Sequence, residues 1–322
     1  MNVSVIIATR NRRALLAKTL EALGRQSYPH ERLEIVVADN GSSDDTRAAV
    51  LAAAAANPGL TIRYLFVETP GKSYAVNAAL EIALGDIFAL TDDDVLPDPD
   101  WIRAVVSAIE QNGVDFVAGR ILPMWESSPP RWMSPALYGV LAVPDNGSER
   151  ARLSRVGESS IVPIGANMAV TRQAVRRIGG LRLDLGKLAG SLRTGEDHEF
   201  FLRLLNTGFD GVYEPAALVH HWVPAERLDP AYFRRWLYQN GRDVQRVETM
   251  YPEPVKRLLG IPRYLWRKGA VDIARVVATT LTNDPSGRFA ATTRLGWLAG
   301  YVREAWFGER SSSVNPLLEA NP

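Results

Sequence analysis

The chain of 322 residues contains no cysteine. This absence excludes disulfide bonds, thiolate zinc sites, iron–sulfur clusters and cysteine nucleophiles, so any bound metal ion must use oxygen or imidazole ligands. An excess of one charge is missing too, because 37 basic residues face 36 acidic ones. Since proteins that bind nucleic acid are usually strongly basic, we expect no nucleic-acid partner.

Long hydrophobic runs are also absent. Nowhere do about 18 uncharged apolar residues follow one another, so the sequence predicts no transmembrane helix. The apolar run 3–8 is too short for the core of a signal peptide, and Arg10, Arg12 and Arg13 follow it instead of preceding it. These features predict a cytoplasmic protein.

The composition is that of an ordinary globular protein, with 46% hydrophobic and 23% charged residues. Short apolar runs alternate with segments of helical length over the first 120 residues, which is typical of an α/β fold with a doubly wound, mostly parallel sheet and helices on both faces. The predicted strands are 3–8, 34–39, 61–66, 86–92 and 115–119, and the predicted helices are 13–24, 46–56, 73–84 and 99–111.

The rest of the chain is less regular. Residues 122–162 are rich in proline, which indicates either a functional cover over a site or a linker. Regular structure is expected to resume at Ile164, with a helix after Gly195 and a strand over 211–219. We expect a catalytic domain over 1–225 and a helical C-terminal extension over 226–322, with helices at 234–247, 271–281 and 289–306.

Polar side chains follow three of the predicted strands, at the edge where such sheets bind ligands. No Gly-x-Gly-x-x-Gly turn follows the first strand, which argues against NAD or FAD chemistry. Asp39, in a turn rich in asparagine, glycine and serine, could accept hydrogen bonds from a nucleotide, or could bond its own backbone. The residues at these strand ends are Thr9, Arg10 and Asn11, then Asp39, then Asp92, Asp93 and Asp94.

Three consecutive aspartates repel one another unless a cation lies among them. Because alternate residues of a strand point the same way, Asp92 and Asp94 could share a hard ion such as Mg²⁺ or Mn²⁺, which would hold a diphosphate. The alternative is that these carboxylates only favour the dipole of the following helix. His220 and His221 end the strand-like stretch 211–219, and an imidazole could complete the metal site or be an ordinary structural histidine.

Glu196 and Asp197 come directly after Gly195 and precede an apolar helical face, so both are predicted in the first turn of a helix. A carboxylate at a helix start that faces a cleft is suited to act as the general base for an acceptor hydroxyl. Acidic residues are also common in first turns for dipole reasons alone.

The order of these motifs is more specific than any one of them, and it closely resembles the family 2 glycosyltransferases with the GT-A fold. The similarity extends from residue 3 to about residue 225. The five ordered segments that carry it are Val3–Asn11, Gln26–Pro29, Glu34–Asp44, Asp92–Val95 and Gly195–Asp197.

This resemblance implies a nucleoside-diphosphate sugar donor and a divalent cation, Mn²⁺ or Mg²⁺. It implies that Asp197 is the catalytic base, that Asp39 contacts the base of the nucleotide, and that Asp92 and Asp94 hold the cation. His221 fits the place of a metal-ligating histidine better than His220 does, although the doublet leaves both open. Val76 stands where an arginine is frequent, which leaves Lys72 to bind phosphate. The residues implied to bind the donor are Thr9, Arg10, Asn11, Asp39, Lys72, Asn77, Asp93 and Asn167.

The implied reaction is an inverting sugar transfer to a hydroxyl of a glycan or lipid-linked acceptor. Glu196, Trp125 and Trp132 are candidate acceptor residues, because tryptophan rings could stack on sugars. A module that binds a nucleotide sugar or glycan without turnover is the alternative, although intact Asp92, Asp94 and Asp197 argue against it. A sugar-1-phosphate nucleotidyltransferase ranks lower, because the loop after the first strand lacks glycine.

The C-terminal third is basic, with 15 Lys+Arg against 10 Asp+Glu over residues 226–322. Aromatic and basic residues mixed on helices are suited to peripheral contact with an anionic membrane at its cytoplasmic face, where a lipid-linked acceptor would be met, but they do not favour this contact over packing within the protein. The alternative is a helical cap on the catalytic domain or a contact within a homo-oligomer. The residues concerned are Trp266, Trp297, Tyr301 and Trp306 with Arg263, Arg267, Lys268, Arg294 and Arg303.

Overall fold

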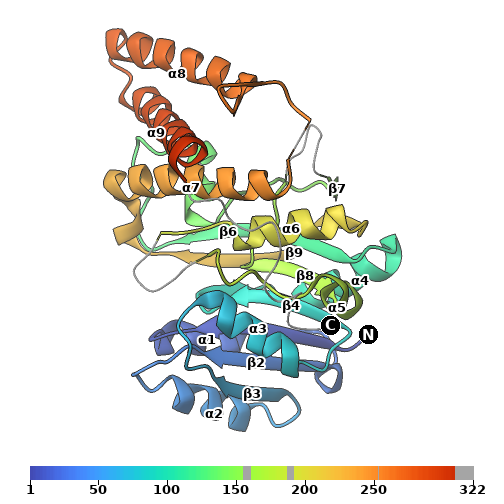
Figure 1. The fold of residues 1–322 in the computed structure, drawn as a ribbon. Helices are drawn as coiled ribbons and strands as arrows, with labels where there is room; N and C mark the ends of the chain where they lie inside the picture. The colour runs from blue at the N-terminus through green and yellow to red at the C-terminus, as the bar shows by residue number, and fades with distance from the viewer. Residues whose placement is uncertain (155–160, 187–191, 253, 309–322) are drawn as a thin grey trace.

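The computed structural model describes residues 1–154, 161–186, 192–252 and 254–308 (Figure 1). One mixed sheet of nine strands forms its centre, in the order β3-β2-β1-β4-β8-β6-β9-β5, with β7 paired to β9. The strands are β1 (Val3–Thr9), β2 (Leu33–Asp39), β3 (Thr61–Phe66), β4 (Ile87–Asp92), β5 (Val95–Pro97), β6 (Phe116–Trp125), β7 (Ala151–Leu153), β8 (Asn167–Thr171) and β9 (Gly211–Val223).

The first four strands of the chain are parallel to their neighbours in the order β3-β2-β1-β4, as the alternating pattern predicted. β8 is antiparallel to both β4 and β6, whereas β6 and β9 are parallel. β5 and β7 run antiparallel to β9. The predicted α/β fold with a doubly wound sheet is confirmed, and its later strands make the sheet mixed.

Helices cover both faces of the sheet and enclose two separate cores, because alternate strand residues point to opposite faces. On β1, Val5 and Ile7 join one core, and Ile6 joins the other. The first core lies under α1 (Arg13–Gly24), α2 (Thr46–Ala56) and α4 (Trp101–Asn112). The second lies under α3 (Lys72–Ile82), α5 (Arg172–Ile178) and α6 (Glu196–Asn206).

The segment from residue 122 is more regular at its start than predicted. β6 continues to Trp125 and pairs in parallel with β9, after a register shift between Gly119 and Arg120. Pro123 argued against a strand, because proline cannot donate a ladder hydrogen bond. It is tolerated here because β8 pairs only with residues 116–118 of β6. Further along, the 3-10 helix η2 (Pro135–Leu141) buries Leu137, Val140 and Leu141 in the first core.

Three long helices follow the sheet: α7 (Pro230–Met250), α8 (Arg263–Leu281) and α9 (Pro285–Phe307), with a small hairpin of β10 (Arg257–Leu258) and β11 (Ile261–Pro262) before α8. Each helix is longer than predicted. α9 crosses α7 so closely that the backbones touch at two glycines. A Cβ atom on Gly241 would lie 2.0 Å from the carbonyl oxygen of Trp297, and a Cβ atom on Gly300 would lie 2.0 Å from the carbonyl oxygen of Tyr238.

α7 lies against the sheet domain, while α8 is the outermost helix, at the end of the molecule opposite α2 and β3 (Figure 1). Among the helices within the described ranges, none combines the length and the apolar character that crossing a membrane requires.

Candidate active site

A cavity of about 640 Å³ opens where the carboxyl ends of β1 and β4 meet α6, η2 and α7. The parallel register places Ala8 beside Asp92. The polar clusters at the ends of β1 and β4, predicted to meet at one edge of the sheet, therefore do so. The predicted site residues that line this cavity are Thr9, Arg10, Lys72, Asp92, Asp93, Asp94, Glu196, Asp197 and His221.

Asp93 is buried and held by two donors. The Thr9 hydroxyl donates to one of its carboxylate oxygens at 2.7 Å, and Arg12 Nη1 donates to the other at 2.9 Å. Burial raises the pKa of Asp93 to about 6; the Arg12 guanidinium opposes this rise and the Asp94 carboxylate adds to it. Arg12 also donates to Asp94 Oδ2 at 2.6 Å, so this one side chain links two of the three aspartates.

Lys72 is the first residue of α3 and reaches Asp92 Oδ1 with its ammonium group at 2.5 Å. Burial alone would lower the pKa of Lys72, but the Asp92 carboxylate raises it above its ordinary value. The carboxylates of Asp197 and Glu196 add to this rise, so Lys72 remains a cation near all three carboxylates.

Asp92, Asp94 and His221 can each offer one ligand atom such that all three atoms lie within 4.8 Å of one another. β9 pairs with β5, the strand that directly follows the three aspartates, and this pairing places His221 beside them. The distance from His221 Nε2 to Asp94 Oδ1 is 3.5 Å. That oxygen is buried and accepts no hydrogen bond from the described residues. Two carboxylates and an imidazole suit Mn²⁺ or Mg²⁺, so this donor set fits a divalent cation. His221, not His220, belongs to the group.

Asp197 lies in the first turn of α6, as predicted. α6 begins after Gly195, whose φ of +106° favours glycine. The Asp197 carboxylate accepts a hydrogen bond from the backbone N–H of Gly165 at 2.8 Å. A Cβ atom on Gly165 would lie 2.8 Å from Asp197 Oδ1, so this approach also requires glycine.

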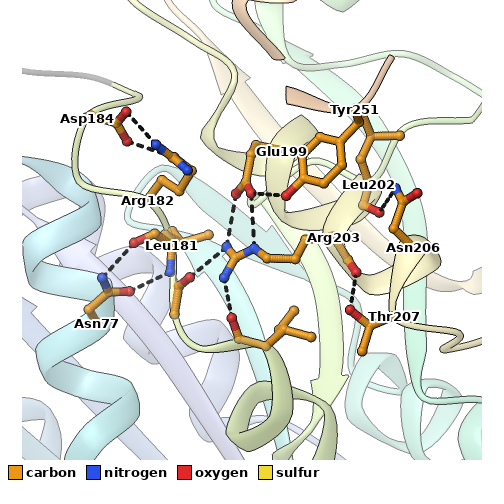
Figure 2. A network of polar contacts seen from close by, with 12 residues as sticks. Asn77, Leu181, Arg182, Asp184, Glu199, Leu202, Arg203, Asn206, Thr207 and Tyr251 are labelled. Atoms are coloured by element: carbon orange, nitrogen blue, oxygen red, sulfur yellow. Dashed lines mark hydrogen bonds and ion pairs between the residues drawn. The ribbon is translucent and has the colours of Figure 1, made fainter. Parts of the chain in front are cut away.

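Buried polar contacts fix α6 and therefore Asp197 (Figure 2). Arg203 pairs with Glu199 one helical turn earlier and donates to the carbonyl oxygens of Ile178 and Gly180. The hydroxyl of Tyr251, just after α7, donates to Glu199 at 2.6 Å. These contacts attach α6 to the turn after α5 on one side and to the end of α7 on the other.

A second attachment lies directly before α6. Asp243 of α7 is fully buried and accepts a hydrogen bond from the backbone N–H of Thr194 at 2.8 Å. Asn240, also on α7, donates to the Thr194 hydroxyl at 3.1 Å. The loop that leads to Asp197 thus depends on a helix that was predicted only as an extension.

The sequence model of one protein family, Glycosyl transferase family 2, matches residues 4–179, more than half of the chain. The chain belongs to this family. This match confirms the resemblance to the family 2 glycosyltransferases that the five ordered segments predicted.

Two relatives come from Haloferax volcanii. Glycosyltransferase AglE is 36% identical over 119 residues, which are 37% of this chain and 39% of that protein. A glucosyl-dolichyl phosphate glucuronosyltransferase is 23% identical over 257 residues, which are 79% of each chain. This chain therefore matches well under half the length of the first relative and about four fifths of the second.

Two solved structures share the architecture. The mannosyltransferase PcManGT from Pyrobaculum calidifontis, in complex with GDP-Man and Mn²⁺, superposes with a TM-score of 0.67 at 21% identity, covering 96% of this chain and 88% of that one. S. aureus TarS 1-349 in complex with UDP superposes with a TM-score of 0.55 at 15% identity, covering 94% and 92%. These likenesses confirm the GT-A fold.

Four predicted donor residues of this family 2 glycosyltransferase do not line the cavity. Asn77 exchanges two hydrogen bonds with the backbone of Leu181 (Figure 2). Asn167 is buried among three partners, of which the Trp101 indole is one. Asn11 and Asp39 both accept hydrogen bonds from the turn after β2, from the N–H groups of residues 43 and 42.

The two tryptophans predicted to meet the acceptor do not line the cavity either. Trp125 lies against the ring of Tyr138. Trp132 packs between Phe233 of α7 and Phe289 of α9, in the first core. Both rings thus join the segment after β6 to neighbouring parts of the protein.

Several cavity residues of this glycosyltransferase were not selected from the sequence. Arg12, in the loop after β1, carries no spacing signal. Asn40 directly follows Asp39, and its side chain fixes the loop before α3 by accepting from the Gly71 N–H at 2.7 Å. Side chains of α7 form part of the cavity wall. In the sequence, only the amphipathic pattern of this helix indicated that one of its faces is covered by the rest of the protein. These α7 residues are Tyr232, Trp236, Asn240 and Val244.

Proposed function

We propose that this family 2 glycosyltransferase transfers a sugar from a nucleoside-diphosphate sugar to a hydroxyl of a glycan or lipid-linked acceptor, with inversion and with a divalent cation. The observation that carries the proposal is one cavity lined by Lys72, by Asp197, by aromatic side chains of α7 and by the three residues that could hold a metal ion, Asp92, Asp94 and His221. Relatives of the same fold solved with GDP-Man or UDP support a nucleotide-sugar donor.

The donor is expected at the carboxyl ends of β1 and β4. A diphosphate carries charge that Lys72 and Arg10, both lining the cavity, are placed to offset. Arg12 is engaged by Asp93 and Asp94, so its contribution is to hold these carboxylates in position. The cavity is large enough for a sugar nucleotide and an acceptor group together.

Asp92, Asp94 and His221 are the residues that would hold the divalent cation. When bound there, Mn²⁺ or Mg²⁺ would offset the negative charge that gathers on the departing diphosphate. The close approach of Lys72 to Asp92 keeps a second positive charge beside this group.

Asp197 is the proposed general base. Its carboxylate is held by the Gly165 N–H, and it takes the proton of the acceptor hydroxyl as that oxygen attacks the anomeric carbon. The new bond from oxygen to carbon forms as the bond from carbon to diphosphate oxygen breaks, and the diphosphate leaves with the electron pair. A single displacement of this kind inverts the anomeric configuration.

The acceptor is expected against α7. Tyr232 and Trp236 line the cavity and are half-buried, so each can present a ring face to a sugar. Glu196, buried beside Asp197, stays a predicted acceptor residue. One relative is named for transfer to a glucosyl-dolichyl phosphate, which supports testing lipid-linked acceptors beside soluble glycans.

The experiment that tests this function measures release of nucleoside diphosphate from UDP-, GDP- and dTDP-sugars, with Mn²⁺, with Mg²⁺ and with chelator. Soluble and lipid-linked glycans are supplied together as acceptors. We expect turnover of one donor that chelator abolishes and an added cation restores. Binding of a donor without release of its nucleotide under all these conditions would instead support a non-catalytic module.

A further inference from the structure

The turn of the β10–β11 hairpin presents a leucine under backbone strain. Leu259 and Gly260 both have positive φ, at +52° and +77°, as a tight hairpin turn with a two-residue loop requires. Asparagine or glycine usually takes the first of these places, because the left-handed conformation costs other residues about 1 kcal/mol. Leu259 is nevertheless 68% exposed, so neither the turn nor the core explains its side chain.

Two tryptophans hold this hairpin. The indole N–H of Trp306, near the end of α9, donates to the carbonyl oxygen of Leu259 at 2.9 Å, and that of Trp266 in α8 donates to Leu258 at 3.1 Å. The hairpin tip and the last turn of α9 thereby form one exposed apolar surface, here called the hairpin patch. It consists of Leu258, Leu259, Trp306 and Phe307, with 53%, 68%, 48% and 76% of each residue exposed.

An apolar stripe on α8 continues from this patch. Trp266, whose ring centre lies 6.4 Å from that of Trp306, begins the stripe. Spacings of three and four residues put its members on one side of the helix, over about 22 Å. The other members are Ala270, Ile273, Val277 and Leu281, all of them exposed. Soluble helices usually carry charge on the outward side, and this stripe carries none.

The concentration of exposed apolar groups is local. Of the fourteen exposed large apolar side chains in the described part of the chain, nine lie between residues 258 and 307. Positive charge accompanies them: residues 254–271 contain five Lys and Arg and no acidic residue. Two acidic residues of the described α8 and α9, Asp272 and Glu304, are buried and paired with arginines. Arg257 donates to the Gly260 carbonyl oxygen at 3.1 Å, and Lys268 lies over the Tyr264 ring at 5.3 Å; neither contact neutralises the positive charge.

We infer that the hairpin patch and the α8 stripe dock on an anionic lipid bilayer, with apolar side chains in the interface and the cations at the phosphate groups. Exposed indoles and leucines beside Lys and Arg are the composition of interfacial anchors, and each cation near an anionic surface adds to the attraction. A symmetric contact centred on the patch would instead bring its own cations together. The inference is independent of the proposed sugar transfer.

The test is sedimentation of the purified full chain with lipid vesicles, without donor or acceptor. Phosphatidylcholine vesicles are compared with vesicles in which a third of the lipid is phosphatidylglycerol. We expect binding to the anionic vesicles, weak binding to the neutral ones, and a marked loss at 1 M salt, where the screening length falls to about 3 Å.

Leu259→Asn is the most informative variant. Asparagine adopts the left-handed conformation readily, so the substitution removes the apolar side chain while relieving strain, and thermal stability is expected to hold. Combined with Phe307→Ser, it is expected to weaken vesicle binding roughly tenfold. Leu51→Asn on α2, an exposed leucine at the opposite end of the molecule, is the matched control and is expected to bind like the wild type.

Two results overturn the inference. One is wild-type protein that stays in solution with anionic vesicles, and the other is a double variant that binds them as the wild type does. If the wild type does not bind vesicles but forms a concentration-dependent dimer, and the double variant is monomeric, the surface contacts a second copy of this chain instead of lipid. Nucleotide release is measured in a separate experiment. Absence of vesicle binding would therefore leave the proposed sugar transfer untouched, and absence of nucleotide release would leave the inferred membrane contact untouched.

Discussion

The backbone N–H of Gly165 donates a hydrogen bond of 2.8 Å to Oδ2 of Asp197, a residue that lines the cavity. A Cβ atom on Gly165 would lie 2.8 Å from the other oxygen of that carboxylate. We expect Gly165→Ala to displace the base and lower kcat at least tenfold, with little change in the KM for the donor. Steady-state kinetics check this. Gly59→Ala, where a Cβ meets nothing within 4 Å, is the control; equal loss in both variants would contradict the account.

Lys72 is the predicted phosphate partner. Lys72→Ala removes the cation beside Asp92, so we expect the dissociation constant of the donor to rise by roughly tenfold to a hundredfold, as for loss of a charge-assisted hydrogen bond. Titration calorimetry with the donor measures it. Lys18→Ala, an exposed lysine outside the cavity, serves as the comparison. Unchanged donor affinity in Lys72→Ala would remove this residue from the donor site.

Trp236 of α7 is expected to bind the acceptor. Trp236→Ala should raise the KM for the acceptor roughly tenfold and leave the KM for the donor unchanged, because the proposal assigns this ring to the acceptor sugar alone. Initial rates with each substrate varied in turn separate the two effects. Trp306→Ala, measured with a soluble acceptor, should match the wild type. A change in the donor KM alone would place Trp236 at the nucleotide instead.

Glu304 joins α9 to α7. It is buried, and it accepts hydrogen bonds from Arg242 at 2.8 Å and from Arg246 at 2.6 Å. Breaking a buried ion pair costs about 3 kcal/mol, so Glu304→Gln should lower the free energy of unfolding by that order at pH 7. Urea unfolding measures it, with the exposed Glu226→Gln as control.

The effect of Glu304→Gln should depend on pH. Burial alone would raise the pKa of Glu304, but the two guanidinium groups lower it below its ordinary value of 4.5. A lowered pKa in the folded state means that the stabilisation is complete above about pH 4.5 and is lost as the pH falls through the lowered value. The difference between wild type and variant should therefore shrink in acid. A difference that grows there would contradict the assignment.

Much of the fold follows from sequence patterns. Buried parallel strands are continuously apolar, so β1, β2 and β4 were predicted to within a residue or two. The half-buried edge strand β3 was predicted with the same bounds, because its residues are mostly apolar or β-branched. The end of β6 was missed because Pro123 suggested that the strand had ended. Proline is tolerated there because β8 does not extend along this part of β6, so no ladder hydrogen bond is lost on that side. Helical periodicity showed that α7 has a covered face, yet periodicity cannot tell whether that face meets a core or a cavity.

The candidate site was predictable where residue type and place on an element agree. Asp92, Asp94 and Asp197 come directly at the end of a strand or the start of a helix, and such places face the ligand edge. Asn77 and Asn167 do not line the cavity, because their amides bond backbone groups instead. Asp39 ends a strand too, but its carboxylate accepts from the turn after β2. The cytoplasmic location, the domain boundary at residue 225 and a homo-oligomer stay predictions.

Asp197→Asn is the most direct test of the central claim that Asp197 is the base of an inverting transfer. Asparagine keeps the shape and can still accept from the Gly165 N–H, so donor binding should match the wild type while turnover falls at least about a hundredfold, as expected for loss of a general base. Asp210→Asn, an exposed carboxylate, is the control. Single-turnover transfer and donor titration on both proteins decide it: intact donor binding with lost transfer is the predicted result, and transfer at the wild-type rate in Asp197→Asn would contradict the account.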